Sequence, residues 1–257
     1  MKATIIEDMK KVELKNPIFI EGFPGLGMVG SIATKYLVKH LNAKKLAVMY
    51  SPHFPYHVIV SKKGGARLLR GEFYFWKNTT GKNDIIFLTG DSQAQTIEGQ
   101  FEVANSILDF VEKKKVETII TIGGYRSEIE GSPKVVAVST NPALFERATK
   151  AKAVASEVGT PIVGTAGLLL GLAKFRKIDA VCLLGETRGY LPDPKTAKSV
   201  IAVLQGILGI TVDLKGLDEE IERSKEILGR MQDIEKRRIQ YMQKMRRVEE
   251  ERITYIS

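Results

Sequence analysis

Cysteine is almost absent from this sequence, since Cys182 is the only one among 257 residues. A single cysteine excludes an intramolecular disulfide and a thiolate metal cluster, and it is typical of a reducing cytosol. Long apolar runs are also lacking. The longest, residues 161–173, is well short of the roughly 20 residues that a membrane helix needs, and Glu7 and Asp8 interrupt the stretch where a secretory signal would be apolar. We therefore expect a cytoplasmic globular protein without a membrane partner.

Acidic residues are fewer than basic ones: 30 Asp and Glu against 39 Lys and Arg give a formal net charge of +9. Nearly all of the excess lies in residues 1–90, scattered as small pairs such as Lys10-Lys11 and Lys62-Lys63. The sequence has no dense basic stripe interleaved with aromatic residues, and no zinc-finger or single-strand-binding signature. The charge therefore predicts solubility and a mildly basic face, not a nucleic-acid partner.

Short apolar runs of strand length alternate with helical patterns through residues 1–213. This alternation predicts an α/β domain with a largely parallel sheet, helices on both faces and an antiparallel patch near residues 56–77. Asn141-Pro142 is a typical helix start. One predicted helix runs from about residue 95 to 115, and its apolar face is formed by Ile97, Phe101, Ala104, Ile107, Leu108 and Val111.

The composition changes at about Leu214, which predicts a second part, a charged helical extension over residues 214–257. Its apolar residues repeat at alternating spacings of four and three, with Arg238 filling the one gap, which is typical of a coiled coil: Ile227, Met231, Ile234, Tyr241, Met245 and Val248. This heptad seam predicts a homo-oligomer, with Ile234, Tyr241 and Met245 as candidate contact residues. The alternative is an amphipathic helix that folds onto its own domain.

A glycine-rich loop over residues 21–30 follows a predicted strand and contains the G-x-G-x-x-G pattern of dinucleotide-binding loops. The acidic residue that should end the next strand and bind a ribose is missing, because that strand ends at residues 50–53 with Tyr-Ser-Pro-His. No G-K-[ST] sequence is present either. We expect a tight strand-to-helix turn with close helix packing, and no cofactor.

Three predicted strands end in polar loops that contain glycine, and ligands bind beyond the carboxyl ends of strands in a parallel sheet. These loops could place Asp91, Arg126, Glu186 and Arg188 around one cleft, to which the glycine-rich loop could add Gly25 and Gly27. Such a set could bind an anion or act in acid–base chemistry. The alternative, which we favour because no nucleophile–base spacing singles out a reaction, is that the charged residues form ion pairs at loop ends or contacts between subunits.

Two further candidates carry less weight. His53 and His57 have the spacing of zinc ligands on a helix, but Pro52 and Pro55 disrupt that helix, so we expect no metal. Cys182 lies within an apolar strand run and is expected to be a buried hydrophobic residue, not a nucleophile.

The letters around the glycines indicate a family. The string G-F-P-G-L-G-M-V-G at residues 22–30 is followed by T-I-G-G-Y at 121–125, G-T-A-G-L-L-L-G at 164–171 and L-G-E-T at 184–187. These motifs, spread over residues 10–212, resemble the proteasome assembly chaperone 2 family. The resemblance implies a nucleoside-phosphorylase-like α/β fold and an archaeal homologue of chaperones that guide proteasome core assembly without nucleotide hydrolysis. It predicts an ATP-independent chaperone or adaptor; the alternative is an enzyme or small-molecule binder that uses the cleft.

Members of this family that act on the proteasome often carry a terminal hydrophobic–Tyr–any-residue motif. The present sequence ends in Ile253-Thr254-Tyr255-Ile256-Ser257, so its tyrosine is third from the end instead of second. We expect a tail contact through Ile253, Tyr255, Ile256 and Ser257 with a partner complex, either proteasome core subunits or a family paralogue. The alternative is a frayed terminus without a partner.

Overall fold

The structure is a computed structural model that describes residues 1–60, 64–81, 83–129, 131–224 and 226–227. The chain divides into two compact units, Met1–Leu214 and Lys215–Ser257. In the second unit, residues 215–224 and 226–227 are helical. The remainder of the predicted extension lies outside the described residues.

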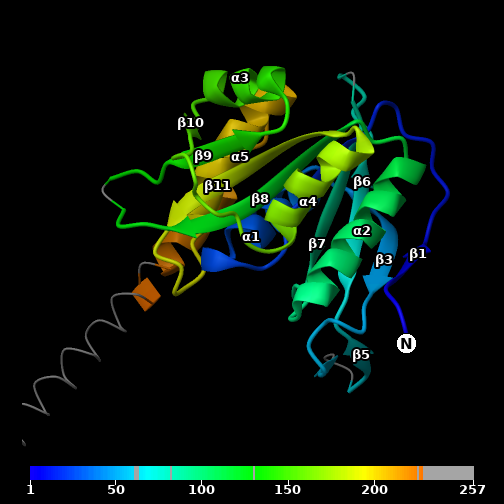
Figure 1. The fold of residues 1–257 in the computed structure, drawn as a ribbon. Helices are drawn as coiled ribbons and strands as arrows, with labels where there is room; N and C mark the ends of the chain where they lie inside the picture. Colours follow the sequence, from blue (N-terminus) through cyan, green and yellow to red (C-terminus); the bar gives the residue numbers. More distant parts are fainter. Residues whose placement is uncertain (61–63, 82, 130, 225, 228–257) are drawn as a thin grey trace, which may run out of the picture. The chain divides into compact units, whose positions relative to one another are not determined.

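The first unit is built on a nine-stranded sheet with the order β1-β3-β6-β7-β2-β8-β11-β9-β10 (Figure 1). Its strands are β1 Ile5–Asp8, β2 Ile18–Glu21, β3 Lys44–Tyr50, β6 Gly71–Trp76, β7 Ile85–Gly90, β8 Thr118–Arg126, β9 Val135–Ser139, β10 Val154–Ala155 and β11 Asp179–Thr187. The inner strands β7, β2, β8 and β11 are parallel to one another. Pairings β1–β3, β3–β6, β6–β7 and β9–β11 are antiparallel. The α/β class is confirmed, but the sheet is mixed.

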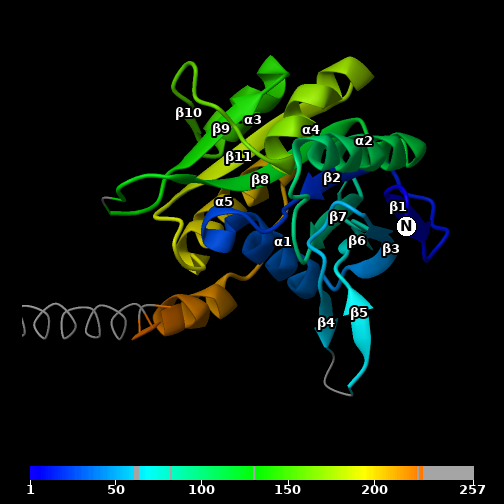
Figure 2. The same ribbon diagram turned by 60° about the horizontal axis from the view of Figure 1, so that its bottom comes forward.

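Helices cover both faces of the sheet, as the sequence predicts (Figure 2). They are α1 Val29–His40, α2 Ile97–Lys113, α3 Pro142–Lys150, α4 Thr165–Ala173 and α5 Pro194–Leu208, with 3₁₀ turns η1 Leu26–Met28 and η2 Lys174–Arg176. Helix α2 packs against α4 on one face, and α1 packs against α5 on the other, where α3 also contacts α5. The predicted antiparallel patch is present: β4 Val58–Val60 and β5 Ala66–Leu68 form a separate hairpin that projects from the body.

Local sequence explains several of these elements. Asn141 caps α3 by accepting the N–H groups of Ala143 and Leu144, as expected. In α2 the predicted face is partly wrong. Ala104, Ile107, Leu108 and Val111 are buried, but Ile97 is 76% and Phe101 45% exposed. The buried stripe of α2 also includes Val103 and Phe110, and the Phe110 ring packs against Phe73 of β6, so Phe101 lies at the edge of the stripe.

The buried interior of the sheet contains Cys182 and the whole of strand β2. Cys182 is fully buried in β11, as expected, and burial raises the pKa of its thiol to about 12. Strand β2 is buried along its whole length, which requires neighbours on both edges and helices on both faces. Within the described residues, no helix combines the length and the apolar character needed to cross a membrane.

Candidate functional site

A cavity of about 640 Å³ lies at the carboxyl ends of the parallel strands β2, β8 and β11. Strand β2 leads into α1 on one face of the sheet, and its neighbour β7 leads into α2 on the other. Loops that leave neighbouring strands in opposite directions leave a crevice between them, where ligands bind in open α/β sheets. The cavity walls are mainly apolar and include Phe23, Leu26, Ile122, Ile162, Val163 and Leu184.

The four motifs that carry the family resemblance all reach this cavity. The glycine-rich loop contributes Gly25, the T-I-G-G-Y motif contributes Gly123, the third motif contributes Gly164 and the fourth contributes Leu184. These segments lie far apart in the sequence and come together only at this edge of the sheet. The cavity is therefore the structural feature that the motifs share.

Glu21, the last residue of β2, lines the cavity and is only 1% exposed. Its Oε1 accepts the Phe23 N–H at 2.9 Å, whereas its Oε2 has no hydrogen-bond partner in the described part of the chain. Burial raises the pKa of Glu21 to about 8, although the Phe23 N–H opposes the rise. At neutral pH this carboxyl group is mostly protonated and uncharged.

Sequence reasoning did not select Glu21. The available signal is an acidic residue that ends the otherwise apolar run of residues 17–20, immediately before the glycine-rich loop. Buried carboxyl groups at strand ends are functional-site candidates because burial shifts their pKa. The same sequence pattern is equally typical of a solvated strand end. Only the burial of Glu21 distinguishes a candidate functional carboxyl group from a solvated one.

A hydrogen-bond network fixes the side of the cavity formed by α2 and α4. Gln93 accepts the Thr165 N–H at 3.0 Å and donates to the Pro24 carbonyl at 2.8 Å. The Thr165 hydroxyl lies 3.0 Å from Gln100 Oε1, and Gln100 donates to the Ala94 carbonyl at 2.6 Å. Both amide side chains are engaged within the protein, so they position the wall of the cavity.

The glycine-rich loop is a tight turn with close helix packing, as expected. A Cβ on Gly22 would lie 2.3 Å from the Gly30 carbonyl oxygen, and one on Gly30 would lie 2.5 Å from that of Ile122. Gly27 has a φ of +60° and packs against Thr187 instead of lining the cavity. These glycines bring α1 close to β2 and β8.

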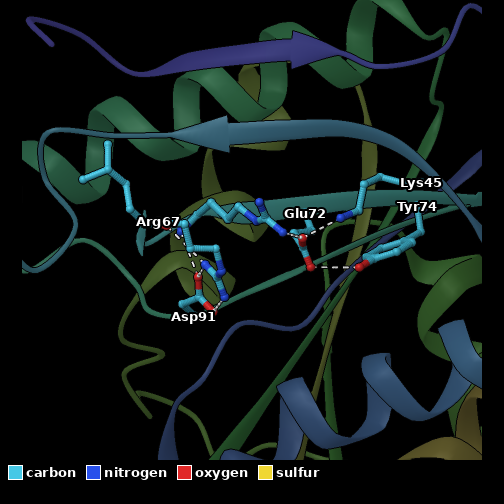
Figure 3. Close-up of polar contacts among 7 residues, drawn as sticks. Lys45, Arg67, Glu72, Tyr74 and Asp91 are labelled. Carbon is cyan, nitrogen blue, oxygen red and sulfur yellow. Dashed lines mark hydrogen bonds and ion pairs between the residues drawn. The ribbon is translucent and has the colours of Figure 1, made fainter. Parts of the chain in front are cut away.

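Asp91 is held in an ion pair (Figure 3) and does not line the cavity. Both of its carboxylate oxygens meet the Arg67 guanidinium, at 2.6 and 3.0 Å, and Oδ2 also accepts the Arg70 N–H. Burial alone would raise the pKa of Asp91, but the hydrogen bonds from Arg67 and Arg70 outweigh burial and lower it. This pair ties β5 to the end of β7.

A second ionic group lies beside it, on the antiparallel part of the sheet (Figure 3). Glu72 meets Lys45 at 2.7 Å and Arg70 at 2.6 Å, and accepts the Tyr74 hydroxyl at 2.8 Å. Burial opposes ionisation of Glu72, but these partners lower its pKa overall. The group connects β3 to β6 and is a structural network.

The other predicted cleft residues are dispersed. Glu186 accepts the Ser127 hydroxyl at 2.9 Å and the Lys134 N–H at 3.0 Å, and the Lys134 N–H is the main reason that its pKa is lowered. Arg188 is exposed. Arg126 lines the cavity, but its exposed side chain lies over the Tyr190 ring, 4.8 Å from the ring centre. Of the four charged residues, only Arg126 reaches the cavity.

The histidine pair does not form a joint site. His53 Nε2 lies 2.9 Å from Glu102 Oε2. Among the residues that the structure describes, no group of three or more His, Cys, Asp or Glu is placed to hold a metal ion. The predicted partner contacts Ile234, Tyr241, Met245, Ile253, Tyr255, Ile256 and Ser257 lie outside the described residues.

The chain is similar to archaeal proteins. It is 41% identical to Pyrococcus furiosus PbaB, described as an archaeal proteasome activator, with a TM-score of 0.87 over 90% of this chain and 100% of that one. It is 28% identical to Pyrococcus furiosus PbaA, described as an archaeal homolog of proteasome-assembly chaperone, with a TM-score of 0.75 over 95% and 98%. It is 30% identical to protein MJ1210 of Methanocaldococcus jannaschii over 88% of this chain and 90% of that protein.

The family model of the PAC2 family matches residues 19–232, which include the whole cavity and all four motifs. The match agrees with the resemblance found from the motifs. This chain belongs to the PAC2 family.

Proposed function

We propose that this protein is an ATP-independent chaperone or adaptor of the proteasome-assembly type, which acts as a homo-oligomer and contacts its partner complex through its C-terminal segment. The observation that carries the proposal is the similarity to PbaB over the whole length of that chain, together with the similarity to PbaA. Both relatives are described by their relation to the proteasome. The proposed partner is therefore the proteasome core particle or one of its subunits.

Features of the described residues support a protein partner. The β4–β5 hairpin projects from the body and carries the exposed apolar side chains of Val58, Val60 and Leu68, and Tyr56, just before β4, is exposed as well. Exposed apolar groups gathered on one element are typical of surfaces that contact other proteins.

Two parts of the C-terminal segment are assigned separate roles. The heptad seam, with Ile234, Tyr241 and Met245, joins copies of the chain. The last residues, with Tyr255 between Ile253 and Ile256, insert an aromatic anchor into a pocket of the partner. Both roles rest on the sequence pattern.

A pull-down with purified archaeal proteasome core particles tests the proposal, using the full chain without ATP. Wild type should retain the core particles, and Tyr255→Ala should reduce retention about tenfold or more, because aromatic anchors dominate such contacts. Thr254→Ala is the matched control and should bind like wild type. Equal retention by all three proteins would overturn the role of the tail. Failure of wild type to retain core particles would overturn the choice of partner.

The enzyme alternative needs Asp91, Arg126, Glu186 and Arg188 in one cleft. Only Arg126 reaches the cavity, Asp91 is paired with Arg67, and Glu186 accepts hydrogen bonds from Ser127 and Lys134. The observation that favours a small ligand is instead the carboxyl group of Glu21.

A further inference from the structure

Glu21 lines the cavity and keeps one carboxyl oxygen without a hydrogen-bond partner in the described residues. Its Oε2 is buried and has no partner in the described part of the chain, and the group lines a cavity with mainly apolar walls. A buried polar atom without a partner is destabilising by about 1–3 kcal/mol, so such atoms are rare unless something completes them. The cavity volume of about 640 Å³ lies within the range of small-molecule sites.

The protonation state of Glu21 determines which ligand can complete it. A protonated carboxyl group donates one O–H and still accepts at its carbonyl oxygen. Oε1 uses one lone pair for the Phe23 N–H and retains a second. Glu21 therefore offers a donor and an acceptor side by side, which matches an adjacent C=O and N–H in the ligand.

We propose that this cavity binds a small uncharged molecule with an amide-type edge, which pairs with the Glu21 carboxyl group while an apolar ring packs against the walls. The Oε2–H donates to the ligand carbonyl, and the ligand N–H donates to Oε1. Phe23, Leu26, Ile122 and Leu184 provide the apolar contacts. Carboxamides, lactams and planar heterocycles with a C=O beside an N–H have this chemistry.

Charged ligands are less compatible with these surroundings. A cation at Glu21 would require two charges to be buried together, and the loss of hydration offsets most of their attraction. An anion would need a cationic partner beside Glu21. Arg126 is the cationic residue lining the cavity, but its side chain is exposed and is stacked over Tyr190. The neutral edge is the ligand that needs no additional charge.

Four small probes with the same ring test the head group: benzamide, benzoate, benzylamine and toluene. Binding to the full chain is measured at pH 6.5 by ligand-detected NMR and by competition. Benzamide should bind at least about tenfold more tightly than the other three, since it alone pairs with both the donor and the acceptor. Preference for benzylamine or benzoate would overturn the neutral-edge proposal, and no binding by any probe at millimolar concentration would overturn the site.

Two substitutions separate hydrogen bonding from shape. Glu21→Gln keeps a donor beside an acceptor and should retain benzamide, whereas Glu21→Leu removes both and should weaken benzamide about tenfold or more. Unchanged benzamide affinity in Glu21→Leu would overturn the proposal. If Glu21→Leu does not fold, the pH dependence of the other two proteins decides.

In wild type, benzamide affinity should fall above pH 8, because Glu21 then loses the proton that it donates. In Glu21→Gln the affinity should not change with pH. Among the described residues, the other ionisable groups near this site are Cys182 of β11, which interacts electrostatically with Glu21, and Tyr125 and Arg126 of β8, which line the same cavity. Burial raises the pKa values of Tyr125 and Cys182, and these residues are the same in both proteins. A pH-independent wild type would contradict the proposal. This test does not involve the proteasome, so it stands or falls independently of the proposed function.

Discussion

At the scale of single residues, the neighbours that surround a side chain in the fold determine whether it is buried, paired or uncharged. Cys182 is buried as predicted because its neighbours in the strand are all apolar. Asp91 forms a loop-end ion pair, as the favoured alternative predicts, but its partner Arg67 lies on a hairpin whose position does not follow from the sequence. Glu21 was missed, because a carboxyl group beside glycines is expected to be solvated, and only the tertiary packing around the end of β2 buries it.

The protonated state of Glu21 predicts how the stability of the fold depends on pH. Between its ordinary pKa of 4.5 and about 8, the folded chain holds a proton that the unfolded chain releases. The free energy of unfolding therefore falls as the pH rises through this interval. Glu21→Gln removes this dependence, so it should gain stability relative to wild type as the pH rises, on the order of 4 kcal/mol by pH 8.

Urea unfolding at pH 5, 6.5 and 8 measures this difference. Glu128→Gln, at an exposed loop position, is the control and should follow wild type at all three pH values. Parallel stability curves for wild type and Glu21→Gln would mean that Glu21 is ionised in the folded protein.

At the scale of elements, the sequence predicted the inner strands best, because each is a short apolar run close to a helical pattern. The mixed edges follow from loop lengths. Residues 77–84 connect β6 to β7 without a crossover helix, so this pair is antiparallel. The position of β9, beside β11 instead of β8, depends on tertiary packing. The short edge strands β1 and β10 have no distinctive pattern.

Two glycine substitutions are expected to change stability in opposite directions, because α1 lies close to β8 at Gly30 whereas the space around Gly171 is open. Gly30→Ala places a Cβ 2.5 Å from the Ile122 carbonyl oxygen, so α1 must shift, and destabilisation of about 1–3 kcal/mol is expected. Gly171→Ala lies in α4, where a Cβ meets nothing within 4 Å, so it should stabilise the protein by up to about 1 kcal/mol. Chemical denaturation of both variants measures these changes. A stable Gly30→Ala variant would contradict the close packing.

At the scale of the whole molecule, four short motifs sufficed to indicate the family, and the structure explains why they are informative together. Each lies at the carboxyl edge of the sheet and contributes to one cavity. The cavity itself could not be predicted, since it depends on the strand order β7-β2-β8-β11, which brings segments more than 150 residues apart into contact. The partner-binding role of the C-terminal segment stays a prediction from sequence.

The division of the chain predicts that the first unit folds alone. A chain that ends after Leu214 keeps the whole nine-stranded sheet and all helices from α1 to α5. It should give the same near-ultraviolet circular dichroism per folded domain as the full chain and unfold in one cooperative transition. Loss of that transition in the shortened chain would show that the second unit is needed for folding.

The proton on Glu21 also changes the net charge of the folded protein. The formal net charge of +9 counts this carboxyl group as ionised. With its pKa at about 8, the folded chain carries close to one more positive charge at neutral pH than its composition indicates. Refolding then draws a proton from the buffer, so the heat of folding measured in a calorimeter varies with the ionisation enthalpy of the buffer chosen.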